Sequence, residues 1–182
     1  MITIIEPHAD DAFLSLGGHI AQWIKEGETV KILTVFSGTR KRAEDAENYA
    51  KATGCLWQGL GFVEGGGGLL GSTAELPPGS LYDVAEGEKI ITPLGIKHSE
   101  HHLVRARLGR GLYYLDQPYS SQVKNTVEVN EKLLGTEVVS FMRPNARKYR
   151  HTKIFKDQSK FFFYNPPENL KHNIELIVED SL

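Results

Sequence analysis

Apolar and polar residues alternate along the first part of the chain in a pattern that predicts a strand followed by a helix. Met1–Glu6 is a short apolar run that ends before Pro7, which is typical of a buried strand. Apolar residues then recur at helical spacing from Phe13 to Ile24, and Gly27 supplies a helix stop. The chain therefore opens with a buried strand and an amphipathic helix.

The alternation of strands and helices continues downstream. Predicted strands follow at Thr29–Phe36, Cys55–Phe62, Glu88–Leu94 and Thr136–Met142, and predicted helices follow at Lys41–Thr53 and His101–Leu108. Strands separated by helices of this length pair in parallel through right-handed crossovers. We therefore expect an α/β fold, a single Rossmann-like domain over residues 1–182 with a mostly parallel sheet and helices on both faces.

One long segment, Glu64–Gly87, interrupts the alternation. It contains four consecutive glycines, Gly65–Gly68, and then the turn-forming run Pro77-Pro78-Gly79. A loop of this length in a compact domain is usually functional or disordered. Because the glycines lack the Lys-Ser/Thr of a P-loop, we expect a loop on the substrate side rather than a phosphate cradle.

Composition and charge narrow the class of partner. The 21 Lys and Arg residues are balanced by 23 Asp and Glu residues, so no basic surplus indicates nucleic-acid binding. No apolar run approaches the ~20 residues of a membrane span. The start of the chain carries no secretion signal, and Cys55 is the only cysteine, so we expect a cytoplasmic protein without an intramolecular disulfide.

The first candidate for chemistry lies where the first strand meets the first helix, at His8-Ala9-Asp10-Asp11. Ligands of a parallel sheet bind beyond the carboxyl ends of its strands, so this position is favourable for a site. The alternative is that Asp10 and Asp11 only cap the helix and complement its dipole. Capping requires one Asp and no neighbouring histidine, whereas a metal site uses the imidazole and one carboxylate and leaves the other carboxylate free.

A second cluster, His98-Ser99-Glu100-His101-His102, follows another predicted strand. The carboxyl ends of parallel strands share one edge of the sheet, so the two clusters are expected to meet there. Together they offer two histidines and a carboxylate around an open position. This donor set suits catalytic Zn²⁺ or non-haem Fe²⁺.

These motifs resemble a known family. A strand, then His8-Ala9-Asp10-Asp11, then Gly17-Gly18 is similar to the N-terminal signature of the PIG-L/LmbE superfamily of zinc-dependent N-deacetylases, which usually reads His-Pro-Asp-Asp-Glu. His98-Ser99-Glu100-His101 is similar to its second motif, His-Pro-Asp-His. A weaker similarity reaches Ile154–Ser159. The chain departs from the pattern at Ala12, which stands where the family has Glu.

The resemblance implies a role for each matching residue. It assigns Zn²⁺ to His8, Asp11 and His101, the general base to Asp10, and substrate contact to Arg42 or Arg40; to His98 it assigns either stabilisation of the oxyanion or protonation of the leaving amine. The donor set of two nitrogens and one carboxylate would also accept Fe²⁺ or Co²⁺. The implied reaction is removal of an N-acyl group, usually acetyl, from an amino sugar or sugar conjugate. The substrate itself and the oligomeric state, including a homo-oligomer, stay open.

Two other functions compete with this interpretation. His8-Ala9-Asp10 with a distant histidine also matches the His-x-Asp…His triad of Fe²⁺ oxygenases. That triad requires a double-stranded β-helix, which the amphipathic helix after Asp11 disfavours. The other alternative is a non-catalytic, sugar-binding relative, and it leaves the second aspartate without a purpose.

Overall fold

The computed structural model describes residues 1–65, 74–77, 79, 81, 85, 87–109, 111–122, 125–143 and 174–181. Most of the predicted glycine loop and the whole of Ile154–Ser159 lie outside these residues. We restrict the description below to the described residues.

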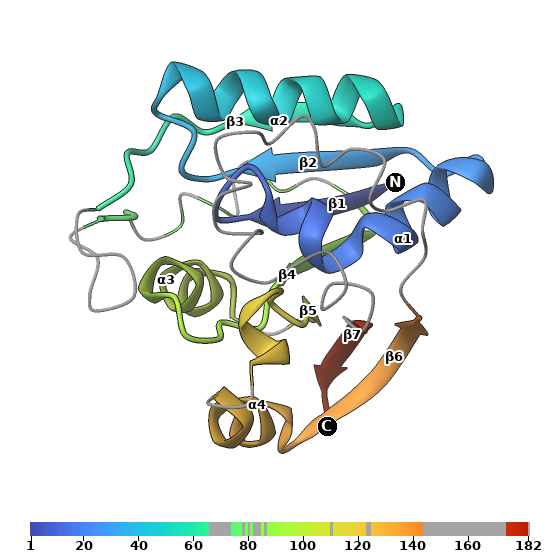
Figure 1. Cartoon of the computed structure of the whole chain (residues 1–182), viewed down its shortest axis with the longest axis vertical. Helices are drawn as coiled ribbons and strands as arrows, with labels where there is room; N and C mark the ends of the chain where they lie inside the picture. Colours follow the sequence, from blue (N-terminus) through green and yellow to red (C-terminus); the bar gives the residue numbers. More distant parts are fainter. Residues whose placement is uncertain are drawn as a thin grey trace.

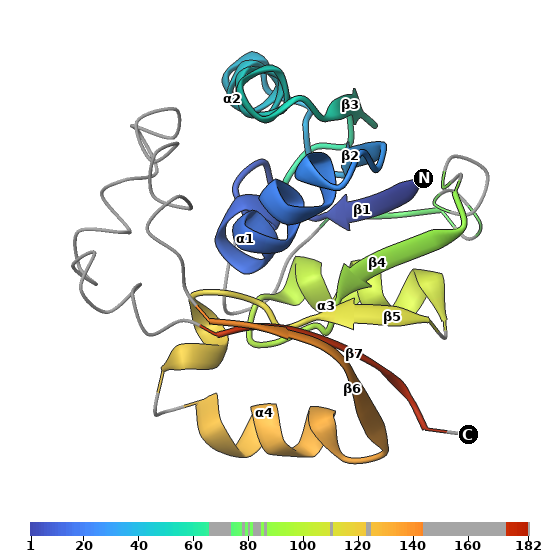
Figure 2. The ribbon, with the colours of Figure 1, turned by 90° about the vertical axis from the view of Figure 1, so that its right-hand side faces the viewer.

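These residues form one seven-stranded sheet in the order β3-β2-β1-β4-β5-β7-β6 (Figure 1). The strands are β1 (Ile2–Glu6), β2 (Val30–Thr34), β3 (Leu56–Gly59), β4 (Lys89–Pro93), β5 (Leu112–Tyr114), β6 (Thr136–Met142) and β7 (Glu175–Asp180). The pairs from β3 through β2, β1 and β4 to β5 are parallel. Strand β7 is antiparallel to both of its neighbours, β5 and β6. Figure 2 shows β6 and β7 as the curved pair at one end of the sheet.

The order of the strands reverses between β1 and β4. From β1 the chain proceeds outward to β2 and β3, then returns to place β4 on the other side of β1. In open α/β sheets a crevice forms beyond the carboxyl ends of the strands at such a switch point. The fold therefore positions a site after Glu6 of β1 and Pro93 of β4.

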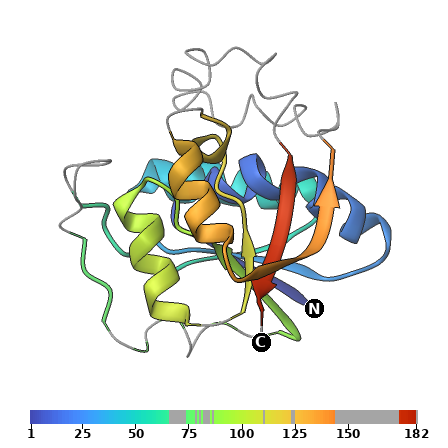
Figure 3. The same ribbon diagram turned by 90° about the horizontal axis from the view of Figure 1, so that it is seen from below.

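Four α-helices are present in the described part of the chain: α1 (Asp11–Lys25), α2 (Arg40–Thr53), α3 (Ser99–Leu108) and α4 (Thr126–Leu133). The helices α2 and α4 lie at opposite ends of the sheet (Figure 1). Figure 3 shows α3 beside α4, where His102 of α3 lies 3.1 Å from Glu128 of α4. None of the described helices is long and apolar enough to cross a membrane.

Apolar side chains fill both faces of the sheet because successive residues of a strand point to opposite sides. Ile4 of β1 packs with Phe13 of α1 on one face. Its neighbour Ile5 packs with Val104 of α3 on the other. Both isoleucines are fully buried, which explains why the strand is a continuous apolar run.

The predicted α/β fold with a mostly parallel sheet is confirmed, and it is not the double-stranded β-helix that the oxygenase alternative requires. Four elements of the described residues were not predicted: β5, β7, α4 and the short 3-10 helix Tyr119–Ser121. Strand β5 has only three residues, too few for a periodicity to register. Strand β7 reads ELIVED, and its three acidic residues mask the apolar pattern.

Candidate functional site

The junction between β1 and α1 presents His8, Asp10 and Asp11. The backbone N–H of Asp11 donates to the carbonyl of His8, and the N–H of His8 donates to Oδ2 of Asp11 at 2.8 Å. Asp10 precedes the helix, yet its side chain makes no capping hydrogen bond. Helix capping therefore does not account for Asp10, and the tight turn brings the imidazole of His8 next to the carboxylate of Asp11.

The junction between β4 and α3 presents His98 and His101. His98 occupies the N-cap of α3, and its Nδ1 accepts the backbone N–H of Glu100 at 3.4 Å. His101 lies in the first turn of the helix and is completely buried. Because α3 begins directly beyond the carboxyl end of β4, both rings are directed to the edge of the sheet where His8 lies.

Three ligand atoms from the two junctions converge on one another. Oδ2 of Asp11 lies 3.3 Å from Nδ1 of His8 and 3.2 Å from Nε2 of His101. Ligands held ~2.1 Å from a tetrahedral Zn²⁺ are separated by about 3.4 Å, so these spacings match two edges of such a tetrahedron. Nitrogen atoms of His8, His98 and His101 also lie within 4.8 Å of one another.

One of these atoms has no hydrogen-bond partner. Nε2 of His101 is buried and makes no hydrogen bond to any described residue, although the ring's other nitrogen is bonded; its 3.2 Å contact with Oδ2 of Asp11 is an ion pair. A buried polar atom that lacks a hydrogen bond calls for an explanation, and a metal shared with Asp11 is one role that supplies it. The donor set and this nitrogen fit a divalent cation.

Two buried carboxylates contact the ring nitrogens of His8 and His101 that point away from Asp11. Oε2 of Glu100 lies 2.6 Å from Nε2 of His8, and Oδ1 of Asp116 lies 2.5 Å from Nδ1 of His101. Such carboxylates orient metal-binding histidines and raise their basicity. From the sequence alone, Glu100 could either orient His101 or face solvent; in the structure it is buried and contacts His8.

Asp116 is a site residue that sequence reasoning missed. It follows β5, the next parallel strand after β4, and therefore lies at the same carboxyl edge. Its other oxygen accepts the backbone N–H of Gly95 at 2.9 Å. The sequence does place an aspartate directly after the apolar run Leu112–Leu115. Its position at the carboxyl edge could not be inferred, because β5 itself was not predicted.

Charges within the cluster favour a cation. Burial disfavours protonation of His8, but the carboxylates of Asp11 and Glu100 reverse this and raise its pKa to about 9. The pKa of His101 is raised in the same way to about 10, chiefly by Asp11 and then by Asp116. Burial acts against ionisation of Asp11, but the two histidines hold its pKa far below the ordinary value. A divalent metal would take the place of the protons that these groups otherwise hold.

The pKa of Asp10 is shifted in the opposite direction from that of its neighbour Asp11. Burial raises its pKa to about 6, the charge of Asp11 adds to the increase, and Arg42 opposes it. Nη1 of Arg42 lies 3.8 Å from Oδ1 of Asp10, and its Nε lies 2.8 Å from Oε1 of Glu64. The structure thus brings Arg42 to the site. Arg40 lies outside it, with a side chain that is 92% exposed and paired with Glu44.

His98 differs from the other two histidines of the cluster. Burial and the neighbouring His8 and His101 lower its pKa to about 4, so its imidazole is neutral at pH 7. Because Nδ1 accepts the N–H of Glu100, the proton of the neutral ring belongs on Nε2. His98 therefore offers an N–H donor. Its ring centroid lies 6.0 Å from that of Tyr119.

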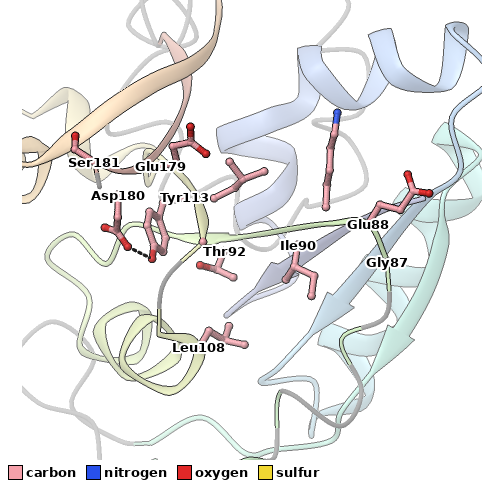
Figure 4. Close-up of a pocket in the computed structure, with 12 residues that line it drawn as sticks. Gly87, Glu88, Ile90, Thr92, Leu108, Tyr113, Glu179, Asp180 and Ser181 are labelled. Carbon is pink, nitrogen blue, oxygen red and sulfur yellow. Dashed lines mark hydrogen bonds between the residues drawn. The ribbon is translucent and has the colours of Figure 1, made fainter.

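A separate pocket of about 390 Å³ lies at the other edge of the sheet, where β4 and β5 begin (Figure 4). It is lined by Ile90, Thr92, Leu108 and Tyr113, among others, and Figure 4 shows the hydrogen bond from Tyr113 to Asp180. Because none of the described residues that line this pocket is a histidine, we place the candidate site at the carboxyl edge.

Comparison with protein families confirms the predicted resemblance. The family model described as PIG-L, GlcNAc-PI de-N-acetylase, matches residues 3–76. This range includes the first motif and Arg42, but not His98 or His101. Comparison with curated protein sequences gives no match.

Solved structures share the fold. The pseudoaglycone deacetylase Dbv21 is 16% identical with a TM-score of 0.69, and the match covers 98% of this chain and 96% of that chain. A zinc-inhibited form of the teicoplanin deacetylase Orf2 is 15% identical with a TM-score of 0.65, covering 99% and 98%. A 4-carboxy-2-hydroxymuconate hydratase from Pseudomonas putida KT2440 is 11% identical with a TM-score of 0.61, covering 100% and 95%. Since deacetylases and a hydratase share this fold, the chemistry has to be argued from the site.

Proposed function

We propose that this protein is a metal-dependent hydrolase that removes an N-acyl group, acetyl in the first instance, from an amino sugar or sugar conjugate. One observation carries the proposal. Ligand atoms of His8, Asp11 and His101 lie at the spacing of a metal site, while Asp10 stands beside them with its carboxylate uncommitted to helix capping. A pure binding site has no use for that second carboxylate.

His8, Asp11 and His101 would hold the cation, with Zn²⁺ as the first choice. A bound Zn²⁺ would polarise the amide carbonyl and lower the pKa of its water from 15.7 to about 7. Two nitrogens and one carboxylate also suit Fe²⁺ and Co²⁺. The zinc-inhibited form of Orf2 supports zinc binding on this fold.

Asp10 would act as the general base. Its side chain belongs to the residue before the ligand Asp11 and is 17% exposed, so it is accessible to a water molecule whose proton it would accept. A pKa of about 6 places the base near its optimum, because it is ionised at pH 7 and still basic enough to take a proton. Arg42 stabilises the ionised form from 3.8 Å.

His98 would stabilise the oxygen that becomes negative during attack. A neutral imidazole with its proton on Nε2 can donate a hydrogen bond to that oxygen without first gaining a proton. The departing amine needs a proton, and the one that Asp10 has accepted is available to it. The residues of the site therefore account for attack, charge stabilisation and departure.

The substrate class is supported by the family match and by charge. The matching model is named for removal of acetyl from a GlcNAc conjugate, and Dbv21 is named as a pseudoaglycone deacetylase. A net charge of −2 gives no support to nucleic acid as a partner. Arg42 would contact the substrate. A single domain over residues 1–182, a cytoplasmic location and a homo-oligomer stay predictions.

The test is a direct assay. The protein is loaded with Zn²⁺ and incubated with N-acetylated sugars and nucleotide sugars, while free acetate and primary amine are both measured. Equal release of the two products that depends on added metal supports the proposal. A metal-loaded protein that releases neither product from any member of the panel, but hydrates an unsaturated acid, would overturn it.

A further inference from the structure

Glu100 is a buried carboxylate that contacts two separate parts of the candidate site. Its side chain is 2% exposed. Oε2 lies 2.6 Å from Nε2 of His8, and Oε1 accepts the backbone N–H of Gly65 at 2.7 Å. One oxygen is thus engaged by a metal-facing histidine and the other by the segment that follows β3.

The contact with His8 determines which nitrogen of the ring faces the cluster. An ionised carboxylate only accepts hydrogen bonds, so the proton of the ring belongs on Nε2. The proton that Asp11 holds on Nδ1, 3.3 Å from its Oδ2, is then the one that a metal would displace, which leaves the lone pair of Nδ1 for the metal. Glu100 therefore sets the tautomer in which His8 can bind a metal.

The contact with Gly65 anchors the chain on the substrate side. The preceding residue, Glu64, holds Nε of Arg42 at 2.8 Å, and Arg42 extends to within 3.8 Å of Asp10. The carboxylate that orients His8 therefore also fixes the segment that holds Arg42 beside Asp10.

The length of the Glu100 side chain makes both contacts available. The resembling family has Asp at this position, one methylene or ~1.5 Å shorter. Shortening the side chain by that amount would extend the 2.6 Å contact with His8 to about 4 Å, beyond hydrogen-bond distance. The departure from the family motif thus coincides with a contact that only the longer residue can make.

We infer that Glu100 is a positioning residue that sets His8 for metal binding with one oxygen and anchors the Gly65 segment with the other. The inference rests on the proposed function, because it takes His8 as a metal ligand. It goes beyond that proposal by linking metal affinity and substrate affinity through a single side chain.

The experiment measures the zinc affinity of the full-length protein and its variants by competition with a chromogenic chelator. Glu100→Asp is too short, and Glu100→Gln offers one acceptor oxygen to two N–H donors. Both should bind zinc 10–100-fold more weakly than the wild type, with a raised KM. Glu128→Gln is the matched control, because Glu128 accepts the N–H of Lys97 and contacts His102 instead of the site; it should keep wild-type affinity.

A second measurement separates positioning from general damage. Nitrogen NMR of the metal-free protein is recorded above the pKa of His8, where the ring carries a single proton. That proton should lie on Nε2 in the wild type, and the tautomer equilibrium should shift in Glu100→Gln. The Gln variant keeps the size of the side chain and is the one to use if Glu100→Asp does not fold. Variants with wild-type zinc affinity and an unchanged tautomer overturn the inference and leave the proposed function intact. A wild type that binds no Zn²⁺, Fe²⁺ or Co²⁺ overturns the proposed function and this inference with it.

Discussion

Two buried histidines of this protein are held by carboxylates and still differ in one decisive way. His19 in α1 has both nitrogens bonded, Nδ1 to Oε2 of Glu175 and Nε2 to Oγ of Ser140, each at 2.9 Å. His101 has Nδ1 bonded to Asp116 and Nε2 without a hydrogen-bond partner. A histidine with both nitrogens hydrogen-bonded is explained by packing, whereas the nitrogen of His101 that lacks a hydrogen bond and lies 3.2 Å from Oδ2 of Asp11 calls for a further explanation, such as a shared metal.

The surroundings of His19 support a structural role. The backbone N–H groups of Gly18 and His19 also donate to Glu175, at 2.8 and 2.9 Å, so that carboxylate joins the middle of α1 to β7. A Cβ at Gly18 would lie 2.6 Å from Sδ of Met142 and 3.0 Å from Oε2 of Glu175. Glycine at position 18 is therefore explained by this close approach rather than by chemistry.

The largest expected effect comes from exchanging each histidine for alanine. His101→Ala removes a ligand and should lower zinc affinity by more than the roughly 100-fold that loss of an outer-sphere contact costs, with loss of activity. His19→Ala should keep zinc affinity within twofold. Metal content after dialysis, together with chelator competition, measures both. Comparable metal loss in the two variants would contradict the distinction drawn from their hydrogen bonds.

The second prediction concerns turnover. Asp10→Asn removes the general base and should lower kcat by about 10²–10⁴-fold, with zinc affinity retained because Asp10 is not among the converging ligand atoms. Ser140→Ala is the counterpart from the His19 cluster. The row Ser140-His19-Glu175 has the order of a nucleophile, a base and an acid, but its interpretation as packing predicts unchanged deacetylation. Steady-state kinetics decide, and a Ser140→Ala variant without activity would refute the structural role.

Stability of the metal-free protein should not separate the two histidines in the same order. His19→Ala leaves the buried carboxylate of Glu175 without its imidazole and should destabilise the protein by about 1–3 kcal/mol. His101→Ala leaves two buried carboxylates, those of Asp11 and Asp116, without their imidazole and should cost at least as much. Chemical denaturation in the presence of a chelator compares the two variants, and a clearly smaller loss in His101→Ala would contradict this expectation.

The smallest effect is a displacement of the pH profile. Asp10 works as a base only when ionised, so kcat/KM should fall tenfold per unit below its pKa of about 6. A bound cation lowers that pKa further, which places the acid limb at or below pH 6. Because Arg42 lowers the pKa of Asp10, Arg42→Ala should move the limb to higher pH, and the exposed Arg40→Ala should leave it in place. Profiles from pH 4 to 9 test this, and a downward displacement in Arg42→Ala would contradict it.

Much of the candidate site was predictable because its residues form two short motifs at strand ends. His8, Asp11, His98 and His101 follow β1 and β4, whose apolar patterns are clear in the sequence. Asp116 could not be found in the same way, because β5 has three residues and gives no periodicity. The contact between Glu100 and His8 depends on the direction of a side chain across the switch point, which sequence spacing does not encode.

The fold shows the same division between local and long-range information. Helix α2 was predicted from its alanine-rich face and from Gly54, which takes a left-handed conformation at its end. Strand β7 was missed because what buries it is its pairing with β5 and β6, not its own composition. Glu175 illustrates this. A glutamate at the start of a strand predicts a solvent-exposed residue, and only the structure shows that backbone N–H groups of α1 donate to its carboxylate.

The reversal of strand order between β1 and β4 has a consequence for how the protein matures. His8 and Asp11 belong to the first half of the sheet and His101 to the second, so neither half brings the three donors together alone. The centre is complete only when β4 has docked against β1. Binding of the metal would thus follow assembly of the two halves. Folding intermediates in which β4 has not yet paired with β1 would not retain the metal.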